Sequence, residues 1–220
     1  MAEAAVTFLL ASTKRLFFWD TQLKNGNWKS RFESKPGDVE GQTIGLIGLG
    51  SIGQTVAHLL QPFDAKLLAY DPYVNPDKAK ALNVSLVSLE ELLKQSQSIV
   101  ILAALTEQTK GMINRKNLQL VQPGAHLLNI SRGGLIESLD VLYEALQSGR
   151  LGAVALDVFE PEPPDIHHPI FKHPNCIATP HALGMTPGAM ERIFRLMAED
   201  IASILRGQKP RSVVNPEVLK

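Results

Sequence analysis

The sequence predicts an α/β protein built on a doubly wound parallel β-sheet with helices on both faces. Apolar segments of strand length alternate with helical patterns along the chain, as they do in βαβ units. One of these segments, residues 99–103, is apolar throughout, which indicates a strand covered on both faces. A glycine-rich turn, GLGSIG at residues 48–53, follows a predicted strand and opens a predicted helix.

Each element is predicted from an apolar run or from a helix signal. The predicted strands are residues 43–47, 66–70, 98–103, 126–130, 153–158 and 176–179. The predicted helices between them are residues 52–61, 89–96 and 138–148. An apolar segment at residues 2–18 predicts a further helix near the amino end.

A last helix is predicted near the carboxyl end. Thr186 is suited to cap its start, Pro187 to occupy its first turn and Gly207 to end it. Its apolar residues recur at helical spacing, which predicts that they belong to the core: Met190, Ile193, Phe194, Met197, Ile201, Ile204 and Leu205.

Composition argues against several classes of partner. Lys plus Arg and Asp plus Glu number 22 each without a basic stripe, so neither nucleic acid nor an anionic membrane is expected. No apolar run approaches the ~18 residues of a membrane span. No basic segment precedes the apolar start, so we expect a cytoplasmic protein without a signal peptide. The single cysteine, Cys176, fits a reducing compartment and is expected to be a small buried hydrophobe.

The glycine-rich turn predicts a Rossmann-like dinucleotide site. Gly48 would allow a tight turn, Gly50 would let a pyrophosphate approach, and Gly53 would let helix and strand pack closely. Asp71 ends the next predicted strand, where its carboxylate can accept hydrogen bonds from ribose hydroxyls and would repel a 2′-phosphate. NAD is therefore favoured over NADP. The less favoured interpretation is a plain glycine turn with a surface aspartate.

Three polar residues that follow predicted strands suggest a catalytic site. Arg132, Glu162 and His181 should meet at the carboxyl edge of the sheet, where open parallel sheets bind ligands. Arginine can bind a carboxylate through two hydrogen bonds, histidine can exchange a proton near neutral pH, and a carboxylate beside histidine fixes its tautomer. Beside a nicotinamide, this set predicts hydride transfer to a 2-oxo acid, with His181 giving the proton and Arg132 holding the substrate.

Plainer interpretations stay open at this point. A histidine that follows a proline, as His181 does, is usually an ordinary surface residue. His167, His168 and His173, with Asp165, could suggest a metal site. Their spacing does not match a known set of ligands, so no metal is predicted.

Five motifs in order resemble one known family. GQTIGLIGLGSIG, YDP, NISRGGLIE, ALDVFEPEP and TPHALG follow one another as in the D-isomer-specific 2-hydroxyacid dehydrogenases, which include 3-phosphoglycerate, glycerate and D-lactate dehydrogenases. Upstream, MAEAAVTFLLASTKRL and NGNW resemble the helix and G-x-W element before the family's dinucleotide domain. The resemblance covers nearly the whole chain. It implies NAD as cofactor, a small 2-hydroxy or 2-oxo acid as substrate, and a homodimer.

The resemblance also implies roles for single residues. Arg132 matches the family's substrate-binding arginine, His181 its catalytic histidine, and Glu162 the glutamate that pairs with this histidine. Besides Arg132 and His181, the positions matched to cofactor contacts are Gly48, Gly50, Ser51, Ile52, Gly53, Asp71, Ala103, Thr109, Ile130, Ser131, Asp157 and Gly184.

The chain also departs from the family pattern. Ser51 stands where arginine is frequent, Ala104 where proline is usual, and the upstream part of the substrate domain is absent. We expect an interdomain or dimer-contact helix and linker at residues 1–38 and an NAD-binding domain at residues 39–185. Residues 186–220 would be a helix and tail returning toward the substrate domain. The alternative function is an NAD(H)-binding sensor or corepressor without turnover.

Overall fold

The sheet has seven strands, all parallel, in the order β3-β2-β1-β4-β5-β6-β7 among the residues that the structure describes, 1–211, 213, 215 and 218. In this computed structural model the strands are β1 (Thr43–Ile47), β2 (Lys66–Tyr70), β3 (Val84–Leu86), β4 (Ser98–Ile101), β5 (Ala125–Asn129), β6 (Leu151–Leu156) and β7 (Cys176–Ala178). The order reverses between β1 and β4, the place where open α/β sheets bind ligands. The predicted parallel α/β fold is confirmed.

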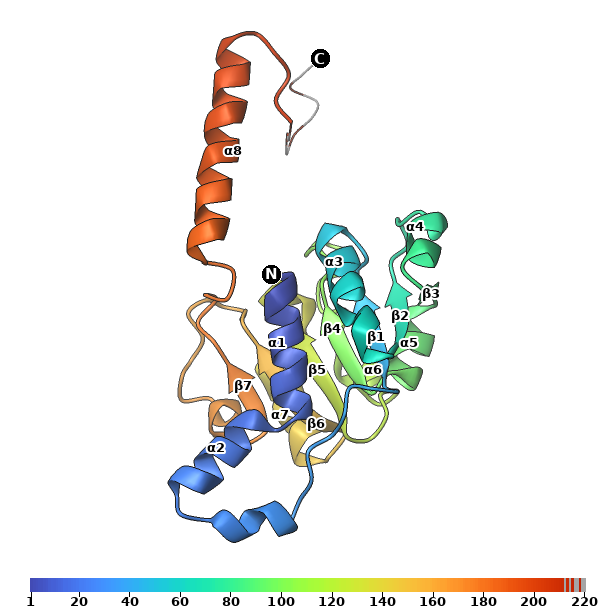
Figure 1. Cartoon of the computed structure of the whole chain (residues 1–220), viewed down its shortest axis with the longest axis vertical. Coiled ribbons are helices and arrows are strands. Elements are labelled where there is room, and N and C mark those ends of the chain that lie inside the picture. The colour runs from blue at the N-terminus through green and yellow to red at the C-terminus, as the bar shows by residue number, and fades with distance from the viewer. Residues whose placement is uncertain (212, 214, 216–217, 219–220) are drawn as a thin grey trace. The chain divides into compact units, whose positions relative to one another are not determined.

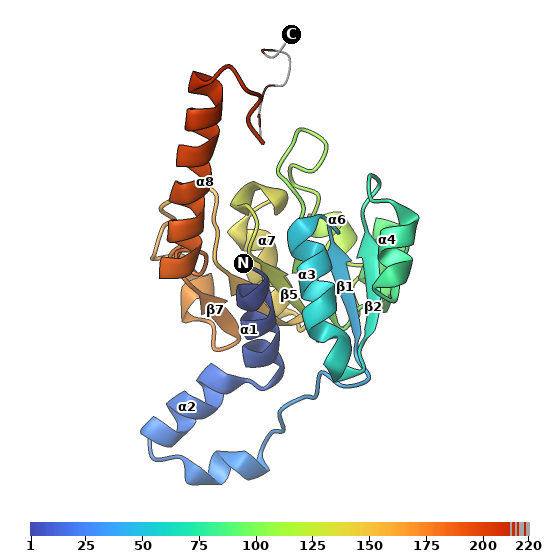
Figure 2. The ribbon, with the colours of Figure 1, turned by 45° about the horizontal axis from the view of Figure 1, so that its top comes forward.

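Helices cover both faces of this sheet (Figure 1, Figure 2). On one face α1 (Ala2–Thr13) and α3 (Ser51–Leu60) lie side by side, and on the other lie α5 (Leu89–Gln95), α6 (Arg115–Leu118) and α7 (Leu139–Gln147). Because both faces are covered, every residue of β4 is buried, which is why its sequence is almost continuously apolar. The other helices before residue 182 are α2 (Leu16–Lys24), α4 (Pro76–Ala81), η1 (Trp28–Phe32), η2 (Gln61–Phe63), η3 (Gly133–Leu135) and η4 (Pro169–Lys172).

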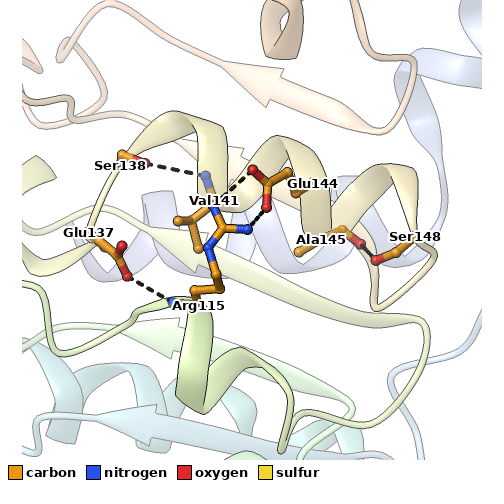
Figure 3. Close-up of polar contacts among 7 residues, drawn as sticks. All are labelled: Arg115, Glu137, Ser138, Val141, Glu144, Ala145 and Ser148. Carbon is orange, nitrogen blue, oxygen red and sulfur yellow. Dashed lines mark hydrogen bonds and ion pairs between the residues drawn. The ribbon is translucent and has the colours of Figure 1, made fainter.

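Polar contacts join α6 to α7 on the second face (Figure 3). The backbone N–H of Arg115 donates to Oε2 of Glu137 at 2.9 Å, and its guanidinium donates to Oε1 of Glu144 at 2.8 Å. The hydroxyl of Ser138 accepts from the N–H of Val141 at 3.3 Å and so caps the start of α7. One short helix is thus held against a longer one beside the core.

The structure adds short elements that were not predicted, among them β3, α4 and α6, and divides a predicted helix. The strand β3 and the helix α4 were not predicted, because both are short and largely exposed and so lack a long apolar period. The helix predicted at residues 2–18 is broken into α1 and α2. At the break Arg15 takes a left-handed φ of 51°, and its guanidinium lies 4.2 Å from the centre of the Phe18 ring.

The chain divides into two compact units, Met1–His181 and Ala182–Lys220, and the second contains α8 (Pro187–Leu205). The hydroxyl of Thr186 accepts from the N–H of Ala189 at 3.2 Å, as expected of its cap. The prediction that the apolar stripe of α8 is core is wrong for this chain: no residue of α8 is buried, and Phe194 is 61% exposed. Helical spacing shows which side chains share a face, but not whether anything covers that face.

The structure also bears on the prediction about membranes. Among the described residues, no helix is both long enough and apolar enough to cross a bilayer.

Candidate active site

The glycine-rich turn leads from β1 into α3, and its three glycines have different roles. Gly48 has a φ of 101°, and a Cβ there would lie 2.8 Å from the backbone N of Ala103. A Cβ on Gly53 would lie 2.4 Å from the carbonyl oxygen of Gly48. A Cβ on Gly50 would meet nothing within 4 Å. The fold therefore requires Gly48 and Gly53, whereas the open space at Gly50 fits the close approach of a phosphate group.

The start of α3 is open to solvent beside this turn. Ser51 and Ile52 form its first turn, and both are exposed. Free N–H groups at the start of such a helix attract the negative charge of phosphates. The turn and the helix start therefore fit a pyrophosphate.

Asp71 follows β2 directly and is held against the glycine-rich turn. Its Oδ2 accepts from the N–H of Leu49 at 2.8 Å, and its Oδ1 accepts from those of Tyr73 at 2.9 Å and Val74 at 3.2 Å. These three bonds fix the carboxylate next to the turn that would hold the phosphates. The side chain stays partly exposed, so its oxygens remain within reach of a ribose.

The loop after β4 is ordered by one hydroxyl. Thr109 donates from Oγ1 to the carbonyl of Ala104 at 2.7 Å and accepts from the N–H of Thr106 at 2.8 Å. Ala103 lies at the start of the loop, where the Ser131 hydroxyl donates to its carbonyl. The position of Thr109 therefore has an internal role, besides the cofactor contact that the resemblance implies.

The chain after β5 carries Arg132 out to solvent. Ile130 is buried, Ser131 is half-buried and Arg132 is exposed, with its guanidinium donating to the Ser131 carbonyl at 2.8 Å. A Cβ on Gly133 would fall 2.0 Å from the carbonyl carbon of Phe159. Gly133 is therefore needed because two loops touch through their backbones, and not because its φ is positive.

Glu162 and His181 form a pair at the same edge of the sheet. Nδ1 of His181 lies 2.9 Å from Oε2 of Glu162, and Oε1 of Glu162 accepts from the N–H of Phe159 at 3.0 Å. The hydrogen bond from His181, then that from Phe159, and then the positive charges of His181 and Arg132 hold the pKa of the Glu162 carboxyl below its usual range. The two side chains keep 43% and 40% of their surface exposed, so the pair can reach a ligand.

The backbone of His181 is unusual for a residue with a side chain. Its φ is 53°, in the left-handed region, and its N–H donates to the Thr179 carbonyl at 2.9 Å. Such conformations are uncommon outside glycine and gather at functional sites. This turn holds the imidazole against Glu162.

A comparison with known protein families agrees with this geometry. The family described as D-isomer specific 2-hydroxyacid dehydrogenase, NAD binding domain, matches residues 6–182. The chain belongs to this dehydrogenase family. NAD is the cofactor of the matched domain, which fits the glycine-rich turn followed by Asp71.

Single relatives are similar along nearly the whole chain. A D-3-phosphoglycerate dehydrogenase of Archaeoglobus fulgidus is 34% identical over 97% of this chain, and a glyoxylate reductase of Thermococcus onnurineus is 36% identical over 99%. A solved D-lactate dehydrogenase of Aquifex aeolicus, complexed with NAD and lactic acid, has a TM-score of 0.85 at 30% identity over 94% of this chain. The chain spans only 40%, 66% and 66% of the lengths of these three proteins.

Two residues at this edge of the sheet were not singled out from the sequence. Thr179 donates from its hydroxyl to Oδ1 of Asp157 at 2.6 Å, and the Asp157 side chain is fully buried. Asn129, also fully buried, makes two hydrogen bonds to the turn that carries Arg132. The available signal was a polar residue that ends an apolar strand, but that signal does not say which groups the residue contacts.

The remaining residues that the sequence analysis considered lie outside the Glu162–His181 pair and the turn that carries Arg132. Gly184 belongs to the second unit. His168 lies 3.0 Å from Oδ1 of Asp140, and no group of three or more His, Cys, Asp or Glu side chains suited to a metal occurs within the described part of the chain. Burial raises the pKa of the Cys176 thiol to about 12, which disfavours the reactive thiolate. The side chain is only partly buried, whereas the sequence predicts a buried one.

Proposed function

We propose that this chain is the cofactor-binding part of an NAD-dependent oxidoreductase that interconverts a D-2-hydroxy acid and a 2-oxo acid. The observation that carries the proposal is the 2.9 Å contact between His181 and Glu162, beside Arg132 and at the edge of the sheet that holds the glycine-rich turn. Bound NAD would supply the acceptor or donor of the hydride. The family membership and the names of the relatives support the same chemistry.

Each of the three side chains has a distinct task in this proposal. Arg132 offers a planar guanidinium to the carboxylate of the acid, since that side chain is exposed at the strand end. His181 uses Nδ1 for Glu162, which leaves Nε2 to give a proton to the substrate oxygen or to take one from it. Glu162, whose pKa is lowered, stays ionised and holds the imidazole in one orientation.

The experiment that tests the proposal separates turnover from cofactor binding. In the whole protein, His181→Ala should lower the reduction of glyoxylate or hydroxypyruvate by about 10²- to 10⁴-fold, the usual contribution of a general acid. The dissociation constant for NADH should stay within about twofold, because the phosphates and ribose are bound elsewhere. The matched control is His167→Ala, since His167 is exposed and lies outside the site.

Two outcomes would contradict the proposal. Unchanged turnover by the His181→Ala variant would show that His181 is not the general acid of the reaction. NADH binding by the wild-type protein, without reduction of any 2-oxo acid in a panel that includes pyruvate and phosphohydroxypyruvate, would favour the sensor instead.

We also propose that the protein acts in the cytoplasm, which its single cysteine fits, and that it is a homodimer, as its family resemblance implies. α1 buries its apolar side chains, among them Phe8 and Leu9, within the chain itself. By contrast α2 has no buried residue, and apolar side chains of α2 and η1 are exposed: Leu16, Phe17, Leu23, Trp28 and Phe32. Exposed apolar side chains that gather in one segment support its use as a contact between subunits.

A further inference from the structure

Asn129 is a polar residue in an apolar place. It is the last residue of β5, is fully buried, and pairs in register with Ile101 of β4 and Leu156 of β6. A buried carboxamide is unfavourable unless its N–H and C=O groups find partners. The partners of this side chain therefore indicate what it does.

Both ends of the carboxamide bond to the turn that leads to Arg132. Oδ1 of Asn129 accepts from the backbone N–H of Ser131 at 3.0 Å, and its Nδ2 donates to the backbone carbonyl of Arg132 at 2.9 Å. The side chain thus holds one peptide group before the Arg132 Cα and one after it. Because the direction of a side chain follows from its backbone, these two hydrogen bonds fix the position from which the Arg132 side chain extends.

The same turn is docked on the loop that carries Glu162. Gly133, next to Arg132, packs directly on the Phe159 carbonyl, and the N–H of Phe159 donates to Glu162 at 3.0 Å. A shift of the turn would therefore change the distance between Arg132 and the Glu162–His181 pair. The amide side chain accepts from Ser131 and donates to Arg132 through two different atoms, whereas an ionised carboxylate of the same size has no donor.

We propose that Asn129 is a positioning residue for substrate binding, which acts by setting the place of the Arg132 guanidinium relative to His181. This inference rests on the proposed function, since it needs a substrate carboxylate that Arg132 binds. According to this proposal, substrate binding depends on the hydrogen bond that Nδ2 of Asn129 donates to the Arg132 carbonyl, and not merely on the volume that the side chain fills.

The test is Asn129→Asp in the whole protein, with Ser98→Ala as the matched control. Asp keeps the size and the acceptor for Ser131 but turns the donor toward Arg132 into an acceptor. Ser98 is equally buried and begins β4, whereas Asn129 ends β5. Its replacement by alanine removes one hydrogen bond, which its hydroxyl donates to Gln42. We expect Asn129→Asp to raise KM for glyoxylate by about 10- to 100-fold, as displacements of the order of 1 Å do.

The dissociation constant for NADH should change less than about twofold, and Ser98→Ala should leave both constants near those of the wild type. If Asn129→Asp does not fold, Asn129→Ala replaces it, since alanine removes the donor without adding volume or charge. A smaller active fraction with an unchanged KM would mean a merely structural role and would overturn the inference alone. No turnover by the wild-type protein would overturn the proposed function together with it.

Discussion

Replacing Gly50 and Gly53 separately by alanine should divide the tasks of the glycine-rich turn. A Cβ on Gly53 would lie 2.4 Å from the Gly48 carbonyl oxygen, whereas ordinary contacts begin near 3.4 Å. The backbone must therefore move by about 1 Å, and overpacking of this kind costs about 1–3 kcal/mol. Gly53→Ala should lower the free energy of unfolding by this amount.

Gly50→Ala should show the opposite pattern. Its Cβ would meet nothing within 4 Å, and its φ of −69° is ordinary for alanine, so the free energy of unfolding should change by less than about 1 kcal/mol. The new methyl group would stand where a pyrophosphate approaches. We expect a dissociation constant for NADH at least about tenfold weaker, which corresponds to about 1.4 kcal/mol.

Urea unfolding and titration of NADH fluorescence measure the two quantities on the same samples. The wild-type protein and both variants would be compared at one pH and one salt concentration. A Gly50→Ala variant that binds NADH as the wild type does would refute the reasoning about open space. A Gly53→Ala variant with wild-type stability would refute the reasoning about close packing.

Two further predictions concern pH and assembly. Because the pKa of Glu162 is lowered on folding, its carboxylate stabilises the protein above about pH 4.5, and this contribution is lost as the pH falls through the lowered pKa. Glu162→Gln should therefore lose less Tm than the wild type between pH 6 and pH 3, and parallel curves would contradict this. Light scattering should find a dimer for the wild-type protein and a monomer for Phe17→Asp, because Phe17 is exposed on α2. The control Ile166→Asp should remain a dimer, because Ile166 is also exposed but does not lie on α2. A monomeric wild type would count against the homodimer.

Much of the sheet could be predicted from local patterns. The ranges predicted for β1 and β2 agree with the structure residue by residue, because the residues of a strand that are covered on both faces are apolar. The turn at residues 48–53 was predictable for a similar reason, since close backbone contacts at Gly48 and Gly53 admit only glycine. The edge strand β3 escaped prediction because Ser85 and Leu86 are exposed.

The sequence by itself determined which side chains end the strands, and so which chemistry gathers at one edge of the sheet. Only the tertiary structure decided how these side chains are held. His181 and Glu162 lie 19 positions apart in the chain, yet 2.9 Å apart in space, because a left-handed turn and the Phe159 N–H fix their loops. In the same way, Asn129 holds the Arg132 backbone, and Gly133 is required by a loop distant in sequence. Contacts of this kind depend on distances between loops, which no local period records.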